Sequence, residues 1–464
     1  MTDPRSSASP LPDAARRDLL DAVGPRGLVI DADERASYEV DWTGRFHGQA
    51  PAVVRPADTA AAAAVVEVAR RHGLALVPQG GNTGLVGGGV PLGGEVVVNL
   101  QRLDHVGEVD VLARQVTAGA GATLAAVRQA ADAAGLRYAV DLAARDSATI
   151  GGNVATNAGG INLIRFGGTR QQVVGIEAVL GTGGVVSHLG GLLKDNTGYD
   201  LAGLLCGSEG TLGLVTAVRL KLVPKPVHTI VALVAFSSID AAVAAVAAWH
   251  LDLDDLESAE LVLDAGLHLV CDTFDRPPPF TTHWPAYVLV EVAGSTDPTD
   301  RLAAAVDGTD GVQDVAVAAD AAHRTALWRY REEHTLAINT LGPPHKLDVT
   351  LPSHALAGFC DEVGDVVTAA APEAQTWLFG HVGDGNIHVN VTGVAPDDER
   401  VDDAVLRYVA DLGGSISAEH GIGTAKRGWL SLVRAPAELA AMRAIKAALD
   451  PDGICNPNAL LPPA

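Results

Sequence analysis

Hydrophobic positions in the first part of the chain form short apolar runs separated by amphipathic segments. Residues 52–55 and 74–78 are short and apolar, which predicts two buried strands, and the alanine- and valine-rich segment between them predicts a helix. Asp58 or Thr59 caps this helix, and Gly73 ends it after His72. The chain therefore opens with a β-α-β pattern. The same criteria predict strands at 95–99 and 115–118 and a helix over 123–134.

A pair of prolines divides this pattern from the next one. The strand predicted at 214–223 stops at Pro224-Lys-Pro226, which marks a domain boundary. Beyond it, strands alternate with helices in an order that favours an α+β domain with an antiparallel sheet. The predicted elements are strands at 229–236 and 286–292 and helices at 240–249, 300–306 and 404–412. A final helical stretch runs to Asp450 and is expected to return to the first domain.

Two histidines surround a glycine-rich turn in His381-Val-Gly-Asp-Gly-Asn-Ile-His388. Alternation after the turn puts His388 and Asn390 on one face of a strand, and the turn can fold His381 back towards His388. Together with the carboxylate of Glu419, the two imidazoles provide the His/His/Glu set of a divalent metal site with an open position. His420, beside that carboxylate, is then a candidate base for a metal-bound group.

Glycines, amides and hydroxyls form a second set of motifs. Residues 74–78 run into Gln79-Gly-Gly-Asn-Thr-Gly84, where successive glycines allow backbone N–H groups to approach a pyrophosphate. The glycines that follow cannot start a helix, so this is no Rossmann fingerprint. Segments 150–160, 194–200 and 207–213 have a similar composition, which suits a long cofactor with a flat ring system. A dinucleotide is expected, with purely structural glycine loops as the alternative.

Taken together, these motifs resemble the FAD-linked D-2-hydroxyacid dehydrogenases of the vanillyl-alcohol-oxidase (PCMH-type) flavoprotein superfamily. The resemblance runs from about residue 50 to 460. It looks closest to the D-2-hydroxyglutarate dehydrogenases, because of segments 327–335 and 345–352. In those enzymes the positions that match Arg331, Thr335 and Lys346 hold the substrate. One departure is Asn456-Pro-Asn-Ala459, where the family has Asn-Pro-Gly-Lys.

The resemblance implies a fold and a cofactor. We expect a disordered tail at 1–13, a PCMH-type FAD-binding domain at 14–225, an α+β substrate (cap) domain at 226–414, and a helical segment at 415–464 that returns to the FAD domain. The loop at 79–84 contains no His or Cys, so the FAD is expected to be non-covalent. The residues expected to bind it are Pro78, Gly80, Gly81, Asn82, Thr83, Gly84, Gly151, Gly152, Asn153, Thr156, Asn157, Gly159, Ser208, Glu209, Gly210 and Asn456.

The predicted chemistry is oxidation of a secondary alcohol next to a carboxylate, most simply that of D-2-hydroxyglutarate. His381, His388 and Glu419 bind zinc, or another divalent metal such as Mn²⁺, and His420 removes the hydroxyl proton. The hydrogen on carbon leaves as hydride to the flavin. Arg331 and Lys346 pair with carboxylates, which suits a dicarboxylate, while Thr335 and Asn390 orient the substrate. An ion pair of Arg331 with Glu332 or Glu333 at the surface is the alternative for that residue.

Other functions remain open at this point. Within the same family, D-lactate or D-malate dehydrogenases, glycolate-oxidase-like enzymes and true oxidases are alternatives. A metal-dependent hydrolase also fits the His/His/Glu set by itself. A flavin-binding subunit without turnover is disfavoured by the intact Glu419-His420 pair. The electron acceptor is undetermined, with an electron-transfer flavoprotein or a quinone as candidates.

Composition adds limits on partners and location. A net charge of −23 argues against nucleic acid and anionic membranes, and it requires local positive charge wherever an anionic substrate binds. No apolar run is long enough for a membrane span. Four widely spaced cysteines without a Cys-x-x-Cys motif favour a reducing cytoplasm over a disulfide framework. We expect a cytoplasmic homodimer.

Overall fold

The computed structural model describes residues 10–463, which form two compact units. Unit 1 contains the described residues up to Gly160, residues 167–225 and residues from Glu419 onwards. Unit 2 contains residues 161–166 and 226–418. Most of the predicted tail, residues 1–9, lies outside the described part, and the first helix begins at its last residue, Asp13.

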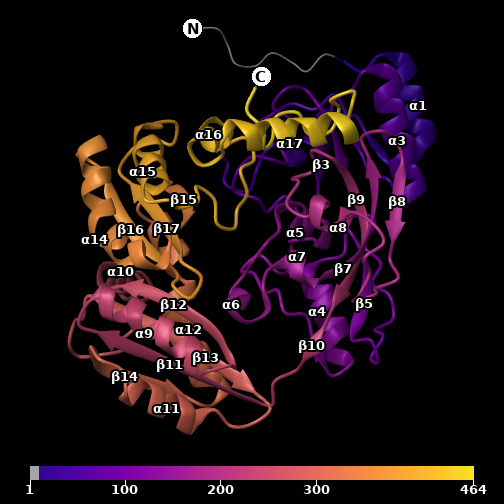
Figure 1. The fold of residues 1–464 in the computed structure, drawn as a ribbon. Helices are drawn as coiled ribbons and strands as arrows, with labels where there is room; N and C mark the ends of the chain where they lie inside the picture. The colour runs from indigo at the N-terminus through magenta and orange to yellow at the C-terminus, as the bar shows by residue number, and fades with distance from the viewer. Residues whose placement is uncertain (1–9, 464) are drawn as a thin grey trace. The chain divides into compact units, whose positions relative to one another are not determined.

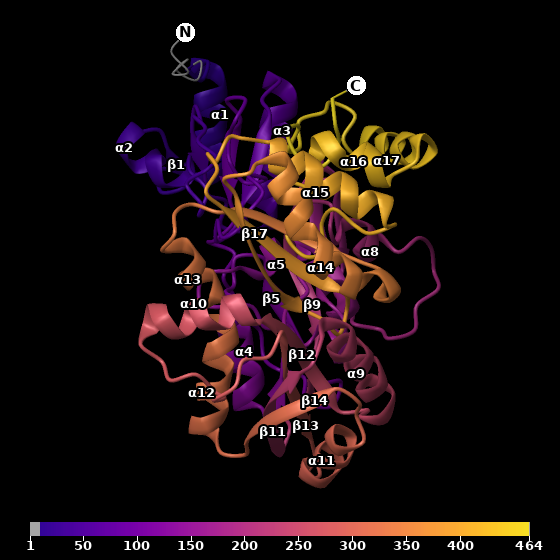
Figure 2. The ribbon, with the colours of Figure 1, turned by 90° about the vertical axis from the view of Figure 1, so that its left-hand side faces the viewer.

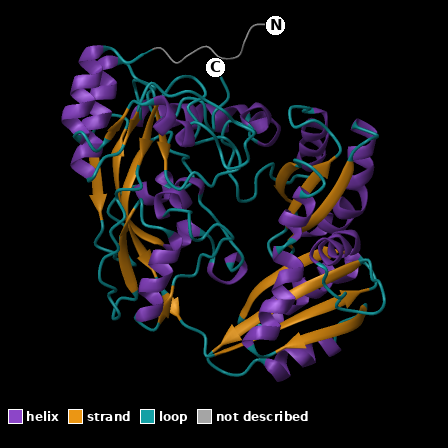
Figure 3. Cartoon of the chain, turned by 180° about the vertical axis from the view of Figure 1, so that it is seen from behind, coloured by secondary structure: helices purple, strands orange, loops and turns teal. Residues whose placement is uncertain are grey.

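Unit 1 contains two four-stranded sheets and a two-stranded one (Figure 3). In the order β1-β2-β4-β3, the strand pairs β2–β4 and β4–β3 are parallel, whereas all neighbours in the order β5-β9-β7-β8 are antiparallel. The strands are β1 (Leu28–Val29), β2 (Val53–Val54), β3 (Leu76–Gln79), β4 (Val96–Asn99), β5 (Gln115–Gly119), β6 (Leu136–Arg137), β7 (Val173–Leu180), β8 (Val185–His188), β9 (Gly213–Lys221) and β10 (Val223–Pro224).

Helices of unit 1 follow the local signals in the sequence. The predicted helix after β2 is α3 (Thr59–His72), and its N-terminus is capped because the Asp58 carboxylate accepts the N–H of Ala61 at 2.8 Å. Gly73 ends it with φ of +64°, a conformation that glycine adopts without strain. The remaining helices are α1 (Asp13–Val23), α2 (Ala32–Arg35), η1 (Ala36–Tyr38), α4 (Leu124–Ala133), α5 (Ile150–Thr156), α7 (Thr169–Gln172), α8 (Leu201–Leu205), η2 (Arg427–Trp429), α16 (Leu430–Val433) and α17 (Pro436–Leu449).

The C-terminal residues pack back onto unit 1, as the yellow segment in Figure 1 shows. Lys446, near the end of α17, donates from Nζ to the carbonyl oxygen of Thr211 at 2.6 Å. Beyond the helix, the Leu76 N–H donates to Ile454 O at 2.7 Å, and the Asn456 N–H donates to Leu76 O at 2.8 Å. The chain end thus runs beside β3, the strand that leads into the glycine-rich loop at 79–84.

Unit 2 is built on one seven-stranded sheet with the order β14-β11-β13-β12-β16-β17-β15. All neighbouring strands are antiparallel, which confirms the prediction for this region. The strands are β11 (His228–Phe236), β12 (Leu256–Leu263), β13 (Ala286–Gly294), β14 (Val312–Ala318), β15 (His345–Thr350), β16 (Gln375–His381) and β17 (Asn386–Thr392).

Helices of unit 2 pack on this sheet (Figure 2). The helix after β15 contacts β16, and the last helix of the unit contacts β15. The helices are α6 (Leu163–Phe166), α9 (Ile239–Asp252), α10 (Asp264–Phe274), α11 (Thr299–Asp307), α12 (Ala321–Glu332), α13 (His334–Asn339), α14 (Ser353–Ala370) and α15 (Arg400–Asp411).

The structure bears on two expectations from composition: that the cysteines form no disulfide framework and that no segment spans a membrane. Cys206, Cys271, Cys360 and Cys455 are buried and carry free thiols, so they form no disulfide framework. Within residues 10–463, every helix is too short or too polar to span a bilayer.

Candidate active site

The His381–His388 segment forms a β-hairpin in unit 2. Strands β16 and β17 pair so that His381 lies opposite Asn386 and Phe379 lies opposite His388. Gly385 in the connecting turn has φ of +79°, which favours glycine at that position. The ring centroids of the two histidines are 5.2 Å apart. The predicted return of His381 towards His388 is therefore confirmed.

Strand register places several polar residues on one face of the sheet, because directly opposed residues in an antiparallel pair share a face and every second residue returns to it. Glu260 on β12 pairs with His381, and Asp348 on β15 pairs with His388. Lys346 pairs with Asn390 in the same two strands. We call this set the polar sheet face: Glu260, His381, Phe379, His388, Asn386, Asn390, Asp348 and Lys346.

Glu260 joins two of the predicted site residues. Its carboxylate, fully buried, accepts a hydrogen bond from His381 Nδ1 at 2.6 Å and another from Arg331 Nε at 2.7 Å. Burial alone would raise the pKa of Glu260, but His381 and Arg331 outweigh that effect and lower the pKa to about 2. Since a carboxylate only accepts, Nδ1 of His381 carries the proton, and a neutral ring presents its Nε2 lone pair to a metal.

Asp348 stands in the same relation to His388. The Asp348 carboxylate is buried, accepts the Asn386 amide at 2.8 Å and lies 3.5 Å from His388 Nδ1. Both candidate metal ligands of unit 2 therefore have a carboxylate at Nδ1. Carboxylates in this position orient histidine ligands and increase their basicity in metal sites.

Arg331 is buried and makes no surface ion pair with Glu332 or Glu333, so that alternative is wrong; Glu333 pairs with Arg276 instead. The guanidinium carbon of Arg331 lies 4.6 Å from the centroid of Phe379, at the same face of the sheet. The His334 ring also packs against Phe379, with the two ring centroids 5.0 Å apart. Thr335 follows directly, so α13 starts beside the polar sheet face.

Lys346 and Asn390 complete the cationic and amide groups of this face. Burial lowers the pKa of the Lys346 ammonium. The side-chain nitrogen of Asn390 is buried and has no hydrogen-bond partner among the described residues. A buried amide donor of this kind normally has an acceptor, so a bound ligand is a natural partner for it.

The predicted FAD residues come together in unit 1 from four segments. Gly210 packs against β3, where an added Cβ would lie 2.2 Å from Pro78 Cγ. The Glu209 N–H donates to Ala155 O at 2.8 Å, which joins the 207–213 loop to α5. The amide of Asn456 donates to Gly88 O at 2.9 Å and to Glu209 O at 2.7 Å. Backbone and side-chain contacts therefore bring all four segments into one region.

Glycines in the 79–84 loop have two different surroundings. A Cβ on Gly80 would lie 2.1 Å from Thr149 Oγ1, and a Cβ on Gly81 would lie 1.9 Å from the carbonyl oxygen of Ser147. A Cβ on Gly84 would meet no atom within 4 Å. The first two glycines are required by packing of the chain on itself, whereas Gly84 borders open space. Asn82 has φ of +53° and donates its amide to Val40 O at 2.7 Å.

Segment 150–160 forms α5 and the turn after it, an element that the sequence pattern did not predict. Thr149 caps the helix by accepting the Gly152 N–H at 3.3 Å, and Thr156 donates its hydroxyl to Gly152 O at 3.1 Å. The side-chain nitrogen of Asn153 is buried and lacks a hydrogen-bond partner among the described residues. This amide and the open side of Gly84 are thus two features of these segments that suit a bound ligand.

The Glu419-His420 pair is held in unit 1 on both sides. Glu419 Oε1 accepts the Gly160 N–H at 2.9 Å. The carboxylate of Glu209 accepts the N–H groups of Ile422 at 2.8 Å and Gly423 at 2.7 Å. Burial raises the pKa of Glu209, although these two N–H donors oppose the shift. The chain is thus held just before and just after His420, and the Glu209 carboxylate has a structural role that its motif did not reveal.

The predicted segment 194–200 and the C-terminal motif at Asn458 differ in exposure and contacts. The side chains from Lys194 to Asp200 are exposed. Asn458, at the departure from the family motif, binds Glu95 through its side chain, and its carbonyl oxygen accepts from Thr424 Oγ1 at 3.0 Å. Gly93 also donates to Glu95, at 2.9 Å, so Asn458 helps to fix the loop before β4.

Sequence reasoning missed Glu260, Asp348 and Phe379. Asp348 had a usable signal, because it follows Lys346 by two residues, and in the strand β15 that spacing puts both on one face. Glu260 lies in β12, Leu256–Leu263, whose residues are buried up to Val262, and an acid buried in a strand needs a partner. Its two partners come from other elements of the unit.

Comparison of the structure with solved ones defines the fold. The chain is similar to p-cresol methylhydroxylase with a TM-score of 0.77 at 15% identity, covering 96% of this chain and 95% of that one. It is similar to 4-ethylphenol oxidase from Gulosibacter chungangensis with a TM-score of 0.73 at 17% identity, covering 96% and 95%. The expected PCMH-type flavoprotein fold, of the α+β class, is confirmed.

Family models and curated relatives give the family. The FAD binding domain matches residues 50–188, and the C-terminal domain of FAD linked oxidases matches residues 225–460. The chain is 37% identical to D-2-hydroxyglutarate dehydrogenase of Xanthomonas citri pv. viticola over 99% of this chain and 97% of the relative. It is 35% identical to the mitochondrial D-2-hydroxyglutarate dehydrogenase of Danio rerio, over 95% and 84%.

The chain is therefore an FAD-linked oxidoreductase. It belongs to the FAD-linked oxidase family, in the group that contains these dehydrogenases. This assignment decides against the metal-dependent hydrolase and against purely structural glycine loops.

Proposed function

We propose that the protein oxidises D-2-hydroxyglutarate to the 2-oxoacid with non-covalent FAD and a divalent metal. The observation that carries this proposal is the polar sheet face, where two carboxylate-oriented imidazoles lie beside Arg331, Lys346 and Asn390. Two proposed metal ligands thus lie on the same sheet as Lys346 and Asn390, and Arg331 of α12 binds Glu260 on that sheet. Curated relatives with the hydroxyglutarate name support the choice of substrate.

His381, His388 and Glu419 would hold the metal, zinc or manganese, with open positions for the substrate. His381 Nδ1 hydrogen-bonds to Glu260 and His388 Nδ1 lies 3.5 Å from Asp348, so Nε2 is the proposed ligand atom in each ring. Glu419 directly follows Ala418, whose N–H donates to Asp348 O at 3.2 Å. A bound divalent ion would lower the pKa of the substrate hydroxyl.

His420 is the proposed base that takes the hydroxyl proton. The backbone on both sides of it is held, since Glu419 accepts from Gly160 and Glu209 accepts from Ile422. A base that is held in place loses little entropy when it reacts. FAD, bound by the glycine loops of unit 1, would supply the hydride acceptor for the substrate carbon.

Arg331 and Lys346 would bind the substrate carboxylates, with Thr335 and Asn390 as orienting groups. Arg331 donates to Glu260 from Nε. Its two terminal amino groups can then make a two-bond contact with a substrate carboxylate. Lys346 provides a second cation, and a dicarboxylate gains from both. These cations also resolve the conflict between an anionic substrate and a chain of net charge −23.

A screen of D-2-hydroxyacids with a dye acceptor tests this proposal. We expect the highest kcat/KM with D-2-hydroxyglutarate, lower values with D-malate and D-lactate, and none with L-enantiomers. Chelation should abolish turnover and leave FAD bound. A demetallated sample with the original rate would remove the metal from the proposal, and equal rates with D-lactate would reduce the assignment to D-2-hydroxyacids in general.

For the surroundings of the enzyme, we propose a cytoplasmic homodimer that passes electrons to an electron-transfer flavoprotein or a quinone. The four buried free thiols support a reducing compartment. Several relatives carry the word mitochondrial in their names, which is a compartment of the same redox character.

A further inference from the structure

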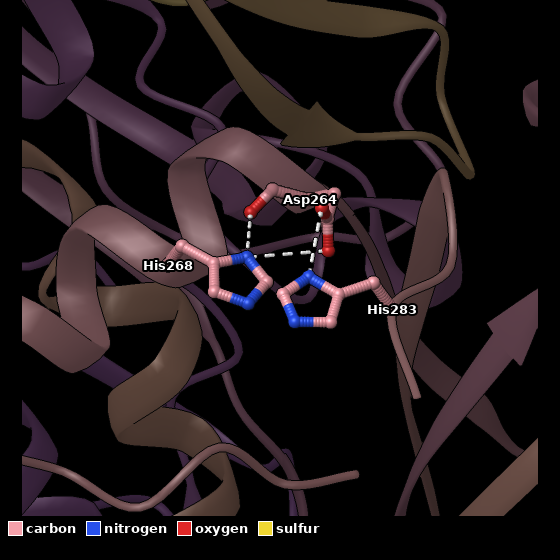
Figure 4. Close-up of side chains that lie close together, drawn as sticks. All are labelled: Asp264, His268 and His283. Carbon is pink, nitrogen blue, oxygen red and sulfur yellow. Dashed lines mark hydrogen bonds and ion pairs between the residues drawn. The ribbon is translucent and has the colours of Figure 1, made fainter. Parts of the chain in front are cut away.

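A second group of metal-ligand side chains lies in unit 2, outside the polar sheet face. It consists of Asp264, His268 and His283, which we call the Asp264 cluster (Figure 4). His268 Nδ1 lies 3.2 Å from Asp264 Oδ1, and His283 Nδ1 lies 3.4 Å from Asp264 Oδ2. The two imidazole rings stack with centroids 4.0 Å apart and an interplanar angle of 3°. Both Nδ1 atoms therefore face Asp264, and His268 Nδ1 also hydrogen-bonds to the backbone carbonyl oxygen of Asp264 at 2.8 Å.

Local structure explains how these three residues meet. Asp264 is the first residue of α10, and His268 follows one turn later, so both lie on one side of that helix. His283 lies in the loop that precedes β13. The next residue, Trp284, donates its N–H to Tyr287 Oη at 2.9 Å, which anchors the loop beside the helix.

Tyr287 also fixes the carboxylate. Its hydroxyl donates to Asp264 Oδ1 at 3.0 Å, and its ring is buried and stacks on Phe280 with centroids 5.8 Å apart. A hydrogen bond to a ligating carboxylate from a rigid neighbour is a common feature of metal sites, because it holds the ligand in its binding orientation. The cluster thus has three candidate metal ligands, and the Tyr287 hydroxyl holds the central one, Asp264, in place.

We propose that the Asp264 cluster binds a late first-row divalent cation, with Zn²⁺ as the best fit. Two imidazoles and one carboxylate are a suitable donor set for this class of ion. Metal–ligand bonds of about 2.0–2.2 Å in a tetrahedron separate neighbouring ligand atoms by about 3.3–3.5 Å. The two Nδ1–carboxylate distances, 3.2 and 3.4 Å, are close to this separation. The ion would replace the proton on each Nδ1, and at His268 it would also displace the hydrogen bond to the Asp264 carbonyl oxygen.

Such a site would connect the start of α10 and the loop before β13. Asp264 and His268 are half-buried and His283 is exposed, so solvent reaches the ion's fourth position. Gly266, between the two helical ligands, packs closely on α13, because an added Cβ there would lie 2.7 Å from His334 Nε2. An ion bound to the folded state alone would stabilise this region as its concentration rises above Kd.

Metal analysis of the FAD-loaded protein tests the proposal. The variant with both His268→Ala and His283→Ala should lose one equivalent of zinc after equilibration and keep its turnover, since neither residue belongs to the proposed catalytic groups. Tyr287→Phe should weaken zinc binding at this site by roughly 10–100-fold, as expected for loss of a supporting hydrogen bond. Thermal stabilisation by added zinc should shrink in both variants.

Two further variants make the outcome specific. His323→Ala removes an exposed histidine that pairs with Asp320 on α12 without a second imidazole, and it should leave the zinc content unchanged. His388→Ala should remove a different equivalent together with turnover, which tests the proposed function independently. Zinc content that is equal in the double variant and the unaltered protein would overturn the proposal for the Asp264 cluster.

Discussion

The glycine loops of unit 1 and the polar sheet face of unit 2 are organised in opposite ways. In unit 1, predicted FAD residues are held mainly by backbone groups, and even the Glu209 carboxylate serves to accept two backbone N–H groups. In unit 2, charged side chains hold one another, with Glu260 between Arg331 and His381. The first arrangement depends mostly on backbone groups, with Glu209 as a buried carboxylate that accepts from them, whereas the second joins buried charged side chains directly to one another.

This difference has consequences for mutation. In a loop held by backbone contacts, a glycine can be replaced by alanine without loss of stability only where the added Cβ meets no neighbouring atom. Where the Cβ would clash, the substitution destabilises the loop. A buried charge network is sensitive at every member, because removal of one partner leaves the others unpaired in a region of low dielectric constant. Each prediction below tests one side of this contrast.

His420→Ala should give the largest effect. A positioned general base contributes about 10²–10⁴-fold, so kcat should fall by this factor while bound FAD and metal stay unchanged. Glu419→Gln keeps an acceptor for the Gly160 N–H but loses the charge that binds the metal, so it should lose both metal and activity. Stopped-flow kinetics and metal analysis measure the two quantities; equal metal loss in both variants would show that the adjacent pair has been assigned wrongly.

Glu260→Gln should disturb the metal and the substrate together. We expect metal affinity to weaken by roughly 10–100-fold, because His381 loses the carboxylate that orients it, and KM to rise because Arg331 loses its partner. Glu257→Gln is a matched control on the same strand, since Glu257 is buried and pairs with Arg165 at 2.6 Å. It should reduce stability without changing metal affinity. The role of Glu260 would be only structural if both variants behaved alike.

Two glycines distinguish packing from cofactor binding in unit 1. Gly81→Ala places a Cβ against the carbonyl oxygen of Ser147, and we expect a loss of about 1–3 kcal/mol in the free energy of unfolding of the FAD-free protein. Gly84→Ala meets nothing within 4 Å, so the FAD-free protein should keep its stability and bind FAD more weakly. Urea unfolding and FAD titration separate the two; unchanged FAD affinity in Gly84→Ala would place the nucleotide elsewhere.

Lys346→Met should give the smallest of these effects. Its ammonium is proposed to bind the distal carboxylate of the substrate, and a charged hydrogen bond contributes about 1.5–3 kcal/mol. The preference for D-2-hydroxyglutarate over D-lactate in kcat/KM should therefore shrink by at least roughly tenfold. The D-lactate rate itself should change little, because lactate has no distal carboxylate. A parallel loss with both substrates would instead assign Lys346 to the shared carboxylate.

Local signals predicted much of the fold. The caps of α3 were readable because they depend on a few neighbouring residues, such as Asp58 and Gly73. The order of strands and helices beyond Pro226 likewise predicted the antiparallel sheet of unit 2. Helix α5 was not predicted, since its two glycines disfavour a helix and its stability comes from the Thr149 cap and from packing against Ala120.

The candidate site was predictable only in part, because some of its residues are neighbours along the chain and others meet only in the folded sheet. His381, His388 and Asn390 lie in one hairpin, so alternation around a turn placed them correctly. Glu260 is joined to His381 by strand pairing across the sheet, and no local pattern reveals which strands become neighbours. Backbone loops with glycine motifs can thus be recognised from a short segment, whereas a charge network requires the completed fold.

The central claim is that this chain transfers a hydride from a D-2-hydroxydicarboxylate to FAD with the help of a divalent metal. Anaerobic mixing of the purified protein with D-2-hydroxyglutarate, followed by the flavin absorption band, tests it most directly. The band should bleach with this substrate and persist with the L-enantiomer, and chelation should prevent bleaching while the FAD stays bound. A band that persists with D-2-hydroxyglutarate, or that bleaches equally after complete removal of the metal, would contradict the account.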